Sequence, residues 1–181
     1  AGMTPADLST GAVIITGETA RKQNANEVLE ALSDFAGDFV VATAGPDLES
    51  VLAARGAGTD TISEEHRTAV ANLDVGGGTT NIAVYQKGTL RGVCCLDIGG
   101  RLIKIADGKI SYIFHKTKKL AEDHGITIAV GDRADEDKLY RICCLMADEL
   151  AKSLHLLPAD EAHKALYTND GAMLPQEPKL L

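Results

Sequence analysis

A run of three consecutive glycines, Gly76–Gly78, constrains the fold of this chain more than any other feature of its sequence. The apolar residues 69–73 and then Asp74 lead into this run, and Thr79-Thr80-Asn81 leads out of it into a second β-rich run, residues 82–85. Glycine loses more backbone entropy than any other residue on ordering, so three in a row weaken a strand. The pattern therefore predicts a β-hairpin whose turn is mostly bare backbone.

A turn of bare backbone allows another molecule to approach the main chain closely. Successive exposed N–H groups suit the oxygen atoms of a phosphate. The structural alternative is a loose hairpin with a glycine bulge. The acidic residue before the glycines and the hydroxyl residues after them favour the phosphate interpretation over this alternative.

Charge and composition exclude several classes of partner. The chain of 181 residues has a net charge of −8, few aromatic residues and no Trp. Nucleic acid binding favours basic patches and stacking rings, and anionic membrane surfaces also attract positive charge. No apolar run approaches the length of a membrane-spanning helix. We therefore expect neither nucleic acid nor a membrane as a partner, and one large domain or one and a half smaller ones.

The cysteines and histidines do not form a metal-binding pattern. The four cysteines form two adjacent pairs, Cys94-Cys95 and Cys143-Cys144, and no Cys-x-x-Cys spacing exists. Neighbouring residues point in different directions on strands and helices, so each pair is expected to place at least one thiol in a core. The five histidines are interpreted as surface or packing residues, and free thiols fit a reducing cytoplasm.

The first part of the chain predicts a parallel sheet. The apolar runs Ala12–Thr16 and Phe39–Thr43 are typical of buried strands, and a helix over Glu27–Phe35 is expected between them. A second helix is expected over Leu48–Arg55, opened by Pro46. This strand–helix–strand order indicates an α/β fold.

The rest of the chain predicts a series of further elements. Residues 61–67 are expected to form a polar connector with Ser63 in a cap-like position. After the glycine hairpin we expect a strand at Leu90–Leu96, a glycine break at Asp97–Gly100 and a hairpin around Asp107-Gly108. A short basic helix at His115–His124 and a strand at Ile126–Val130 are expected next. The last expected element is a long helix at Ala134–Leu157, stopped by Pro158. The basic run Lys116, Lys118 and Lys119 is interpreted as a solvated helix face, and the leucines at the C-terminus suggest a fragment of a longer protein.

This order resembles the actin/DnaK-type chaperone/sugar-kinase ATPase superfamily. There, a proline-started helix ending in glycine precedes a phosphate-binding hairpin of pattern Asp-x-Gly-Gly-Gly-Thr, which matches Asp74–Thr79 here. The stretch Asp97–Arg101 falls where the superfamily carries a glycine pair. The resemblance implies an α/β, ribonuclease-H-like actin-type ATPase fold that is present in part. Its expected parts are the second half of domain I (1–68), the start of domain II (69–157) and a tail (158–181) leading to a missing strand.

Several stretches are similar to one family within that superfamily, the EutA family of ethanolamine ammonia-lyase reactivating factors. They are residues 15–20, 38–50, 72–81 and 95–102. Members of this family act as chaperones that use ATP and Mg²⁺ to release damaged cobalamin from the inactivated lyase. The resemblance implies ethanolamine ammonia-lyase as the partner, and the cytoplasm or a bacterial microcompartment as the location. It leaves the oligomeric state open.

The resemblance also assigns roles around the phosphates. Asp74 is expected to hold Mg²⁺ through its waters, since Mg²⁺ keeps several waters in nucleotide sites. A carboxylate that caps the turn is the structural alternative for Asp74. For Thr80 and Asn81 the alternative is an ordinary strand residue. The expected phosphate ligands are the backbone N–H groups and hydroxyls of Gly76, Gly77, Gly78, Thr79 and Thr80.

Three further residues complete the implied site. Glu18 is a candidate for orienting the attacking water, and a solvated loop carboxylate is the alternative. Gly99 and Gly100 are expected to face the nucleotide across the cleft, and a tight turn is the alternative. The family's first phosphate hairpin and its adenosine segment would lie outside residues 1–181, so ATP hydrolysis is expected only of the full-length protein.

Two other functions remain open at this point. One is a small-molecule kinase on the same fold, which needs a carboxylate base beside the phosphates. The other is a non-catalytic interaction module, either an actin-like assembly protein or a microcompartment-associated scaffold. Loss of nucleotide-dependent function on changing Gly77 would separate an ATPase from such a scaffold.

Overall fold

A computed structural model describes residues 12–15, 27, 31, 40–43 and 45–168 of this chain. The chain divides into two compact units, Ala1–Glu49 and Ser50–Leu181. The second unit contains both glycine stretches, so it is the unit that positions the candidate site.

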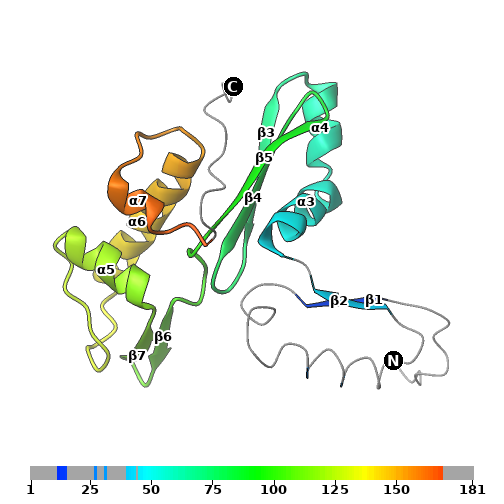
Figure 1. Ribbon diagram of the computed structural model, residues 1–181. Coiled ribbons are helices and arrows are strands. Elements are labelled where there is room, and N and C mark those ends of the chain that lie inside the picture. The colour runs from blue at the N-terminus through cyan, green and yellow to red at the C-terminus, as the bar shows by residue number, and fades with distance from the viewer. Residues whose placement is uncertain (1–11, 16–26, 28–30, 32–39, 44, 169–181) are drawn as a thin grey trace. The chain divides into compact units, whose positions relative to one another are not determined.

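The parallel pairing predicted for the first two apolar runs is confirmed. Strands β1 (Ala12–Ile15) and β2 (Val40–Thr43) lie side by side in parallel, with Ala12 opposite Val40 (Figure 1). Parallel strands need a long crossover, usually a helix. The helix predicted there, Glu27–Phe35, lies mostly outside the described residues.

Two helices lead towards the glycine hairpin. The first, α3 (Pro46–Gly56), begins at the predicted proline. The second, α4 (Thr59–Glu65), shows that the prediction of a polar connector over residues 61–67 was wrong. This segment shows no apolar periodicity because the buried side of α4 consists of two small hydroxyl residues, Thr59 and Ser63.

Ser63 has a packing role rather than the predicted capping role. Its hydroxyl donates a hydrogen bond to the carbonyl of Asp60 (2.8 Å). The same oxygen accepts a hydrogen bond from the N–H of Gly88 (2.9 Å), in the turn between β4 (Thr80–Gln86) and β5 (Thr89–Leu96). A single small side chain thus ties α4 to the central sheet.

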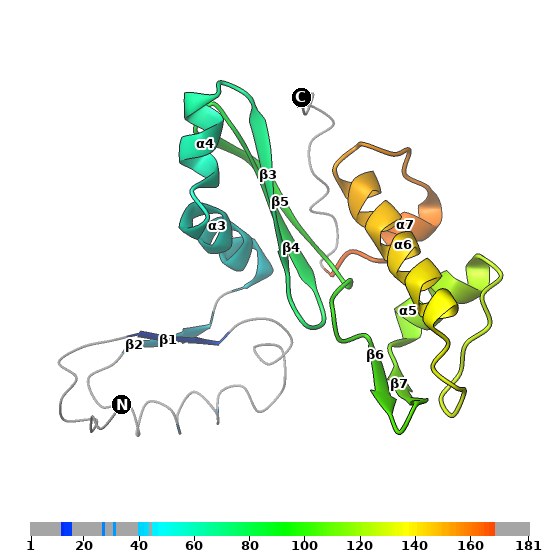
Figure 2. The same cartoon turned by 180° about the vertical axis from the view of Figure 1, so that it is seen from behind.

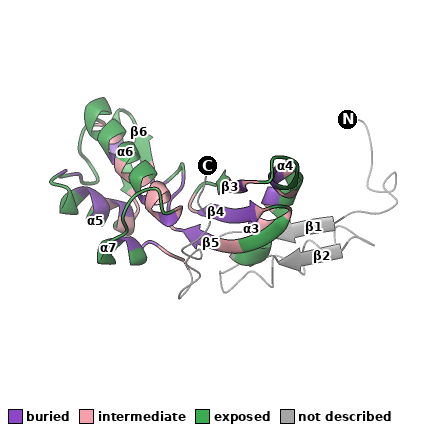
Figure 3. Ribbon diagram, turned by 90° about the horizontal axis from the view of Figure 1, so that it is seen from above, coloured by how far each residue is buried: buried purple, intermediate pink, exposed green. Residues whose placement is uncertain are grey.

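The central sheet consists of the antiparallel strands β3 (Ala69–Val75), β4 (Thr80–Gln86) and β5 (Thr89–Leu96), in that order. Residues on β4 are buried from Thr80 to Tyr85 (Figure 3). Successive side chains of a strand point to opposite faces, so this burial requires cover on both faces. On one face, Ile82 packs in a cluster with residues of β5, with residues of α6 (Glu136–Ser153) and with Leu166 of the tail. On the other face, Tyr85 packs with Ala54 of α3.

Two hairpin turns have positive φ at both central residues, and the turn predicted at Asp107-Gly108 is confirmed. The turn between β4 and β5 has φ of 52° at Lys87 and 75° at Gly88. Strands β6 (Ile103–Ala106) and β7 (Lys109–Ile113) pair around Asp107 (φ 51°) and Gly108 (φ 72°). Two consecutive residues with positive φ are the mark of the tight turn that matches strand twist.

A second core lies between the β6–β7 hairpin and two helices, α5 (His115–Asp123) and α6 (Glu136–Ser153) (Figure 2). The strand predicted over Ile126–Val130 does not form. Ile126 and Ile128 are buried in this core, which explains the alternating pattern. The N–H of Ile126 bonds to the carbonyl of Ala121 instead of to a neighbouring strand.

The long helix is shorter than predicted. Asp135 caps α6 by accepting a hydrogen bond from the N–H of Lys138 (2.9 Å). The helix ends at Ser153, and His155 then takes a positive φ of 59°, so Pro158 is not what stops it. The cysteine prediction is confirmed for Cys94-Cys95, which are both buried, and wrong for Cys143-Cys144, which are both exposed.

A short helix in the tail, α7 (Glu161–Lys164), was not predicted, and it closes onto α6 through a buried polar network. Glu149 is 3% exposed and accepts hydrogen bonds from Lys152 (2.6 Å) and from the fully buried His163 ring (2.7 Å). After α7, the carbonyl of Leu166 accepts the N–H of Asp97 (2.7 Å) at the end of β5. The corner between α6 and α7 therefore supports the second glycine stretch.

Tyr167, which lies at this corner, leads us to expect that the protein loses stability in alkali. Burial, with the nearby Cys94 and Glu149, raises the pKa of Tyr167 from 10.0 to about 12. The unfolded state therefore ionises first, so the stabilisation is complete below pH 10 and is lost as the pH rises towards 12. We expect the wild-type protein to lose more free energy of unfolding than Tyr167→Phe between pH 9 and 12, in urea titrations. Tyr140→Phe, at a side chain that is 70% exposed, should follow the wild type.

Candidate functional site

The loop between β3 and β4 is a tight turn of bare backbone, as predicted. Strand β3 ends at Val75 and β4 begins at Thr80. The N–H of Gly76 donates to the carbonyl of Thr79 (2.8 Å) and closes the turn. Gly76 and Gly77 are exposed, whereas Gly78 and Thr79 are half-buried.

The second glycine stretch, Ile98–Arg101, packs directly onto this loop. The N–H of Gly100 donates to the carbonyl of Gly76 (2.9 Å), and that of Arg101 donates to the carbonyl of Gly77 (2.7 Å). A Cβ atom on Gly99 would lie only 2.7 Å from backbone atoms of Gly77 and Gly78. The structure therefore brings the two predicted glycine clusters into backbone contact.

Thr80 joins the same assembly from inside the sheet. Its side chain is fully buried, and its hydroxyl donates a hydrogen bond to the carbonyl of Ile98 (2.7 Å). This bond links the first residue of β4 to the second glycine stretch. The hydroxyl proton of Thr80 is thereby engaged within the protein.

The loop carbonyls and the loop amides differ in their bonding. The carbonyls of Gly76, Gly77 and Thr79 all accept hydrogen bonds from backbone N–H groups. Among the described residues, none accepts a hydrogen bond from the N–H groups of Gly77, Gly78 or Thr79. Three consecutive donors without a protein partner form a local positive potential, which is the arrangement that backbone anion sites use.

Asp74 supplies a carboxylate on the same hairpin. Asp74 is exposed. No described residue donates a hydrogen bond to its carboxylate or forms an ion pair with it. Its cross-strand partner is Asn81, which is 3% exposed and whose Oδ1 atom has no hydrogen-bond partner. Buried polar atoms are nearly always paired, so this oxygen calls for a donor or a cation that is not part of the described chain.

These features fit the implied nucleotide and Mg²⁺. Mg²⁺ prefers oxygen ligands and commonly uses one or two carboxylates together with waters and phosphates. Asp74 offers a free carboxylate, and the unpaired loop amides offer donors to phosphate oxygens. The nearest neighbour of a Cβ atom on Gly77 would be the Arg101 side chain, at 3.4 Å.

Glu18, the predicted water-orienting residue, lies outside the described residues. Its role stays a prediction. The described parts of the chain hold no group of three or more His, Cys, Asp or Glu side chains suited to a metal ion.

Arg101 is a residue of the site that sequence reasoning did not single out. The Cβ, Cγ and Cδ atoms of its side chain lie 3.4–3.9 Å from the position of a Cβ atom on Gly77. Within the described part of the chain, its guanidinium makes no ion pair. The signal was present in the sequence as a cation directly after the second glycine pair.

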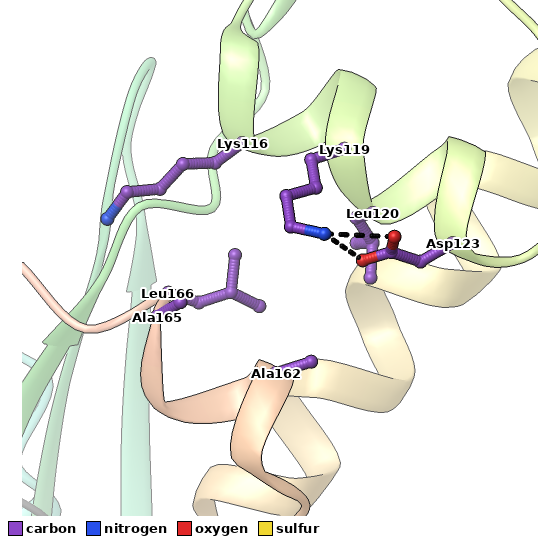
Figure 4. A pocket seen from close by; sticks show the side chains of 7 residues that line it. All are labelled: Lys116, Lys119, Leu120, Asp123, Ala162, Ala165 and Leu166. Atoms are coloured by element: carbon purple, nitrogen blue, oxygen red, sulfur yellow. Dashed lines mark hydrogen bonds and ion pairs between the residues drawn. The ribbon is translucent and has the colours of Figure 1, made fainter.

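Two cavities lie outside the loop. One, of about 70 Å³, lies between α5 and α7 and is lined by apolar atoms of Leu120, Ala162 and Leu166 (Figure 4). The lysines at its edge are neutralised, because Lys119 pairs with Asp123 (2.8 Å) and Lys116 with Asp97 (2.5 Å). Lys118 and Lys119 lie on an exposed face of α5, as predicted, and their ion pairs with Glu122 and Asp123 offset their charge. This cavity is therefore not suited to a phosphate.

The second cavity, of about 230 Å³, lies beside the glycine pair. Its lining consists mainly of apolar side chains from the β6 region and α6, including Ile103, Leu139 and Met146, together with the backbone of Gly99 and Gly100. Its lining residues include no cation, so this cavity is less suited to an anion than the unpaired amides of the loop.

A protein-family model described as "Ethanolamine utilisation protein EutA" matches residues 1–180. The chain belongs to the EutA family. It is 49% identical over 187 aligned residues to the ethanolamine ammonia-lyase reactivase EutA of Salmonella typhimurium, an alignment that covers 94% of this chain and 40% of that protein. The chain thus spans about two fifths of the length of this curated relative.

More distant similarity extends to a cell division protein and to a solved structure. The cell division protein FtsA of Buchnera aphidicola is 27% identical over 128 residues, covering 68% of this chain and 27% of that protein. A solved Ppx/GppA family member from Aquifex aeolicus aligns with a TM-score of 0.46 at 24% identity, covering 77% of this chain and 37% of that one. The EutA chain has the α/β fold class of the actin-type ATPases.

None of the helices in the described parts of this EutA chain is both long and apolar enough to cross a lipid bilayer.

Proposed function

We propose that this chain is the phosphate-binding part of an ATP-dependent reactivase of ethanolamine ammonia-lyase. In this proposal the full-length protein uses ATP and Mg²⁺ to release damaged cobalamin from the inactivated lyase. Membership of the EutA family and the similarity to a reactivase support the partner. The observation that carries the proposal is the row of unpaired N–H groups at Gly77, Gly78 and Thr79 beside the free carboxylate of Asp74.

The residues would divide the work as follows. Phosphoryl transfer depends on positioning and charge neutralisation rather than on covalent help from the protein. The loop amides would hold the terminal phosphate oxygens, and the hydroxyl of Thr79 would add a donor. Asp74 would hold Mg²⁺, which supplies charge neutralisation at the phosphates. Gly99 and Thr80 would act by fixing the loop backbone, through the contacts described above.

Location and organisation are part of the same proposal. We assign the activity to the cytoplasm or to a bacterial microcompartment, where the lyase would be the partner. The domain limits 1–68, 69–157 and 158–181, and a role for Glu18 in orienting water, stay predictions. ATP hydrolysis is proposed for the full-length protein that carries this chain.

The test is a reactivation assay with a matched glycine variant. Inactivated lyase carrying damaged cobalamin is incubated with the full-length protein, ATP, Mg²⁺ and adenosylcobalamin, and recovery of ethanolamine turnover is measured. We expect recovery only with ATP. Gly77→Ala should reduce recovery by roughly tenfold or more, because its methyl group would occupy the exposed side of the loop where a phosphate must approach. The protein should still fold, since the new contact with Arg101 is an ordinary 3.4 Å.

Gly56→Ala is the control, because a Cβ atom on Gly56 has nothing within 4 Å. It should leave recovery unchanged. Absence of recovery with the wild-type protein would refute the proposal. Transfer of phosphate to a small acceptor would instead favour a kinase. Binding to the lyase that is the same with and without ATP, and the same for wild type and Gly77→Ala, would favour an interaction module.

A further inference from the structure

The side chain of Arg101 is placed on the candidate phosphate loop by its own backbone. Its N–H donates to the carbonyl of Gly77 (2.7 Å), which fixes the Arg101 Cα atom against the loop. The first three carbons of the side chain then run along Gly77, with Cδ 3.4 Å from the position of a Cβ atom there. The stem thus lies at ordinary van der Waals distance from the space where a side chain at position 77 would begin.

The charges around the loop leave Arg101 as the available cation. Lys116 is paired with Asp97, the residue directly before the second glycine stretch, at 2.5 Å. Lys118 and Lys119 form ion pairs along α5 with Glu122 and Asp123. Arg101 is exposed and forms no ion pair with any described residue.

The chemistry of the proposed ligand requires such a cation. The terminal phosphates of ATP carry several negative charges, and Asp74 adds another at the same hairpin. Backbone N–H groups contribute only partial charges. A guanidinium offers several donors in a fixed planar fork that matches phosphate oxygens, and it stays protonated at all physiological pH values.

We propose that Arg101 binds the terminal phosphate of ATP and makes the site prefer the triphosphate over the diphosphate. This inference rests on the proposed function, since it assumes that the loop binds a nucleotide. Arg101 reaches the ligand over Gly77, so the glycine and the arginine act as one unit. The second glycine stretch therefore contributes a ligand as well as a packing surface.

The test compares two nucleotides on four proteins. Equilibrium binding of ADP and of a non-hydrolysable ATP analogue, each with Mg²⁺, is measured by calorimetry on the full-length wild type, Arg101→Met, Arg101→Ala and Arg91→Ala. Methionine keeps an unbranched stem on Gly77 but removes the charge. Arg91 is an exposed arginine near the opposite end of β5, so its removal changes the net charge equally away from the loop.

We expect Arg101→Met and Arg101→Ala to weaken binding of the ATP analogue by roughly tenfold to a hundredfold, the range of a charge-assisted hydrogen-bonded pair. Binding of ADP should change by less than about threefold, and Arg91→Ala should match the wild type for both ligands. Thermal unfolding of each variant checks that it is folded.

The other outcomes overturn the inference in distinguishable ways. If the wild type binds both nucleotides and Arg101→Met binds each of them as tightly as the wild type does, the inference fails while the proposed function stands. The same holds if only Arg101→Ala is impaired, because the effect would then come from lost packing. If the wild-type protein binds neither nucleotide, the inference and the proposed function both fail.

Discussion

Replacement of Gly99 by alanine should lower the free energy of unfolding by about 3 kcal/mol, the upper part of the range for overpacking a well-packed site. The new methyl carbon would lie 2.7 Å from backbone atoms of Gly77 and Gly78, closer than real Cβ contacts occur. These neighbours are main-chain atoms, so no side chain can rotate away to relieve the clash. The two glycine stretches must separate, and their shared hydrogen bonds must stretch or break.

The adjacent glycine provides a matched control. A Cβ atom on Gly100 would lie 3.8 Å from its nearest neighbour, the carbonyl oxygen of Gly76. Gly100→Ala should therefore stay within about 0.5 kcal/mol of the wild type, as exposed substitutions usually do. Urea unfolding gives both values. Faster hydrogen exchange at the N–H groups of Gly100 and Arg101 in Gly99→Ala alone would locate the damage.

Equal stability of the two alanine variants would contradict the close packing of the two glycine stretches. It would also remove the reason for a glycine at position 99, since the clash is purely steric and the residue does not need a positive φ. The outcome thus bears on how the loop backbone is held in place.

The sequence was sufficient to predict the glycine hairpin because its signal is local. An apolar strand, an acidic residue, three glycines and a second apolar strand specify a hairpin with a bare turn. In contrast, the contact between Gly99 and Gly77 joins residues that are twenty-two positions apart along the chain. Nothing in local composition states which carbonyls become bonded and which amides stay free, so the polarity of the loop emerged only from the tertiary contacts.

Arg101 was missed for a related reason. A cation after a glycine pair is a weak signal until its stem is known to lie on Gly77. From the sequence alone, another cation, Lys116, looked equally able to bind a phosphate. Only the ion pair with Asp97 separates the neutralised lysine from the unpaired arginine.

The errors in the fold share one cause, which is that burial patterns do not specify backbone pairing. Ile126 and Ile128 alternate like a strand because both enter a core, yet this segment has no ladder partner. Helix α4 was taken for a connector because its buried residues are Thr59 and Ser63 rather than large apolar side chains. Tertiary packing decided both segments, whereas the strongly patterned elements β4 and α5 followed their local sequence.

The network between α6 and α7 carries the second large expected effect. Glu149 is nearly fully buried and accepts hydrogen bonds from both Lys152 and His163. Partial burial acts to lower the pKa of Lys152, but hydrogen bonds to Glu149 and Asp160 raise it above its ordinary value of 10.5. The lysine therefore stays charged and needs its partner.

Glu149→Ala should lower the free energy of unfolding by about 3–5 kcal/mol, the cost of removing one member of a buried pair. The histidine ring would keep only its contacts with Tyr167. The Lys152 ammonium group would keep only its pair with the exposed Asp160. Because α7 leads into the segment that bonds Asp97, the damage should extend to the end of β5 and its glycine stretch.

A second glutamate at the same corner gives the comparison for this value. Glu161 pairs with Lys164, but its side chain is 88% exposed, so Glu161→Ala should cost about 1 kcal/mol or less. The raised pKa of Lys152 adds stability that is complete below pH 10.5 and is lost as the pH rises through the folded-state pKa. The difference in free energy of unfolding between wild type and Glu149→Ala should therefore be smaller in strong alkali. Urea titrations at pH 7 and pH 11 measure both effects. Equal losses for the two alanine variants at pH 7 would mean that burial of Glu149 does not determine the stability of this corner.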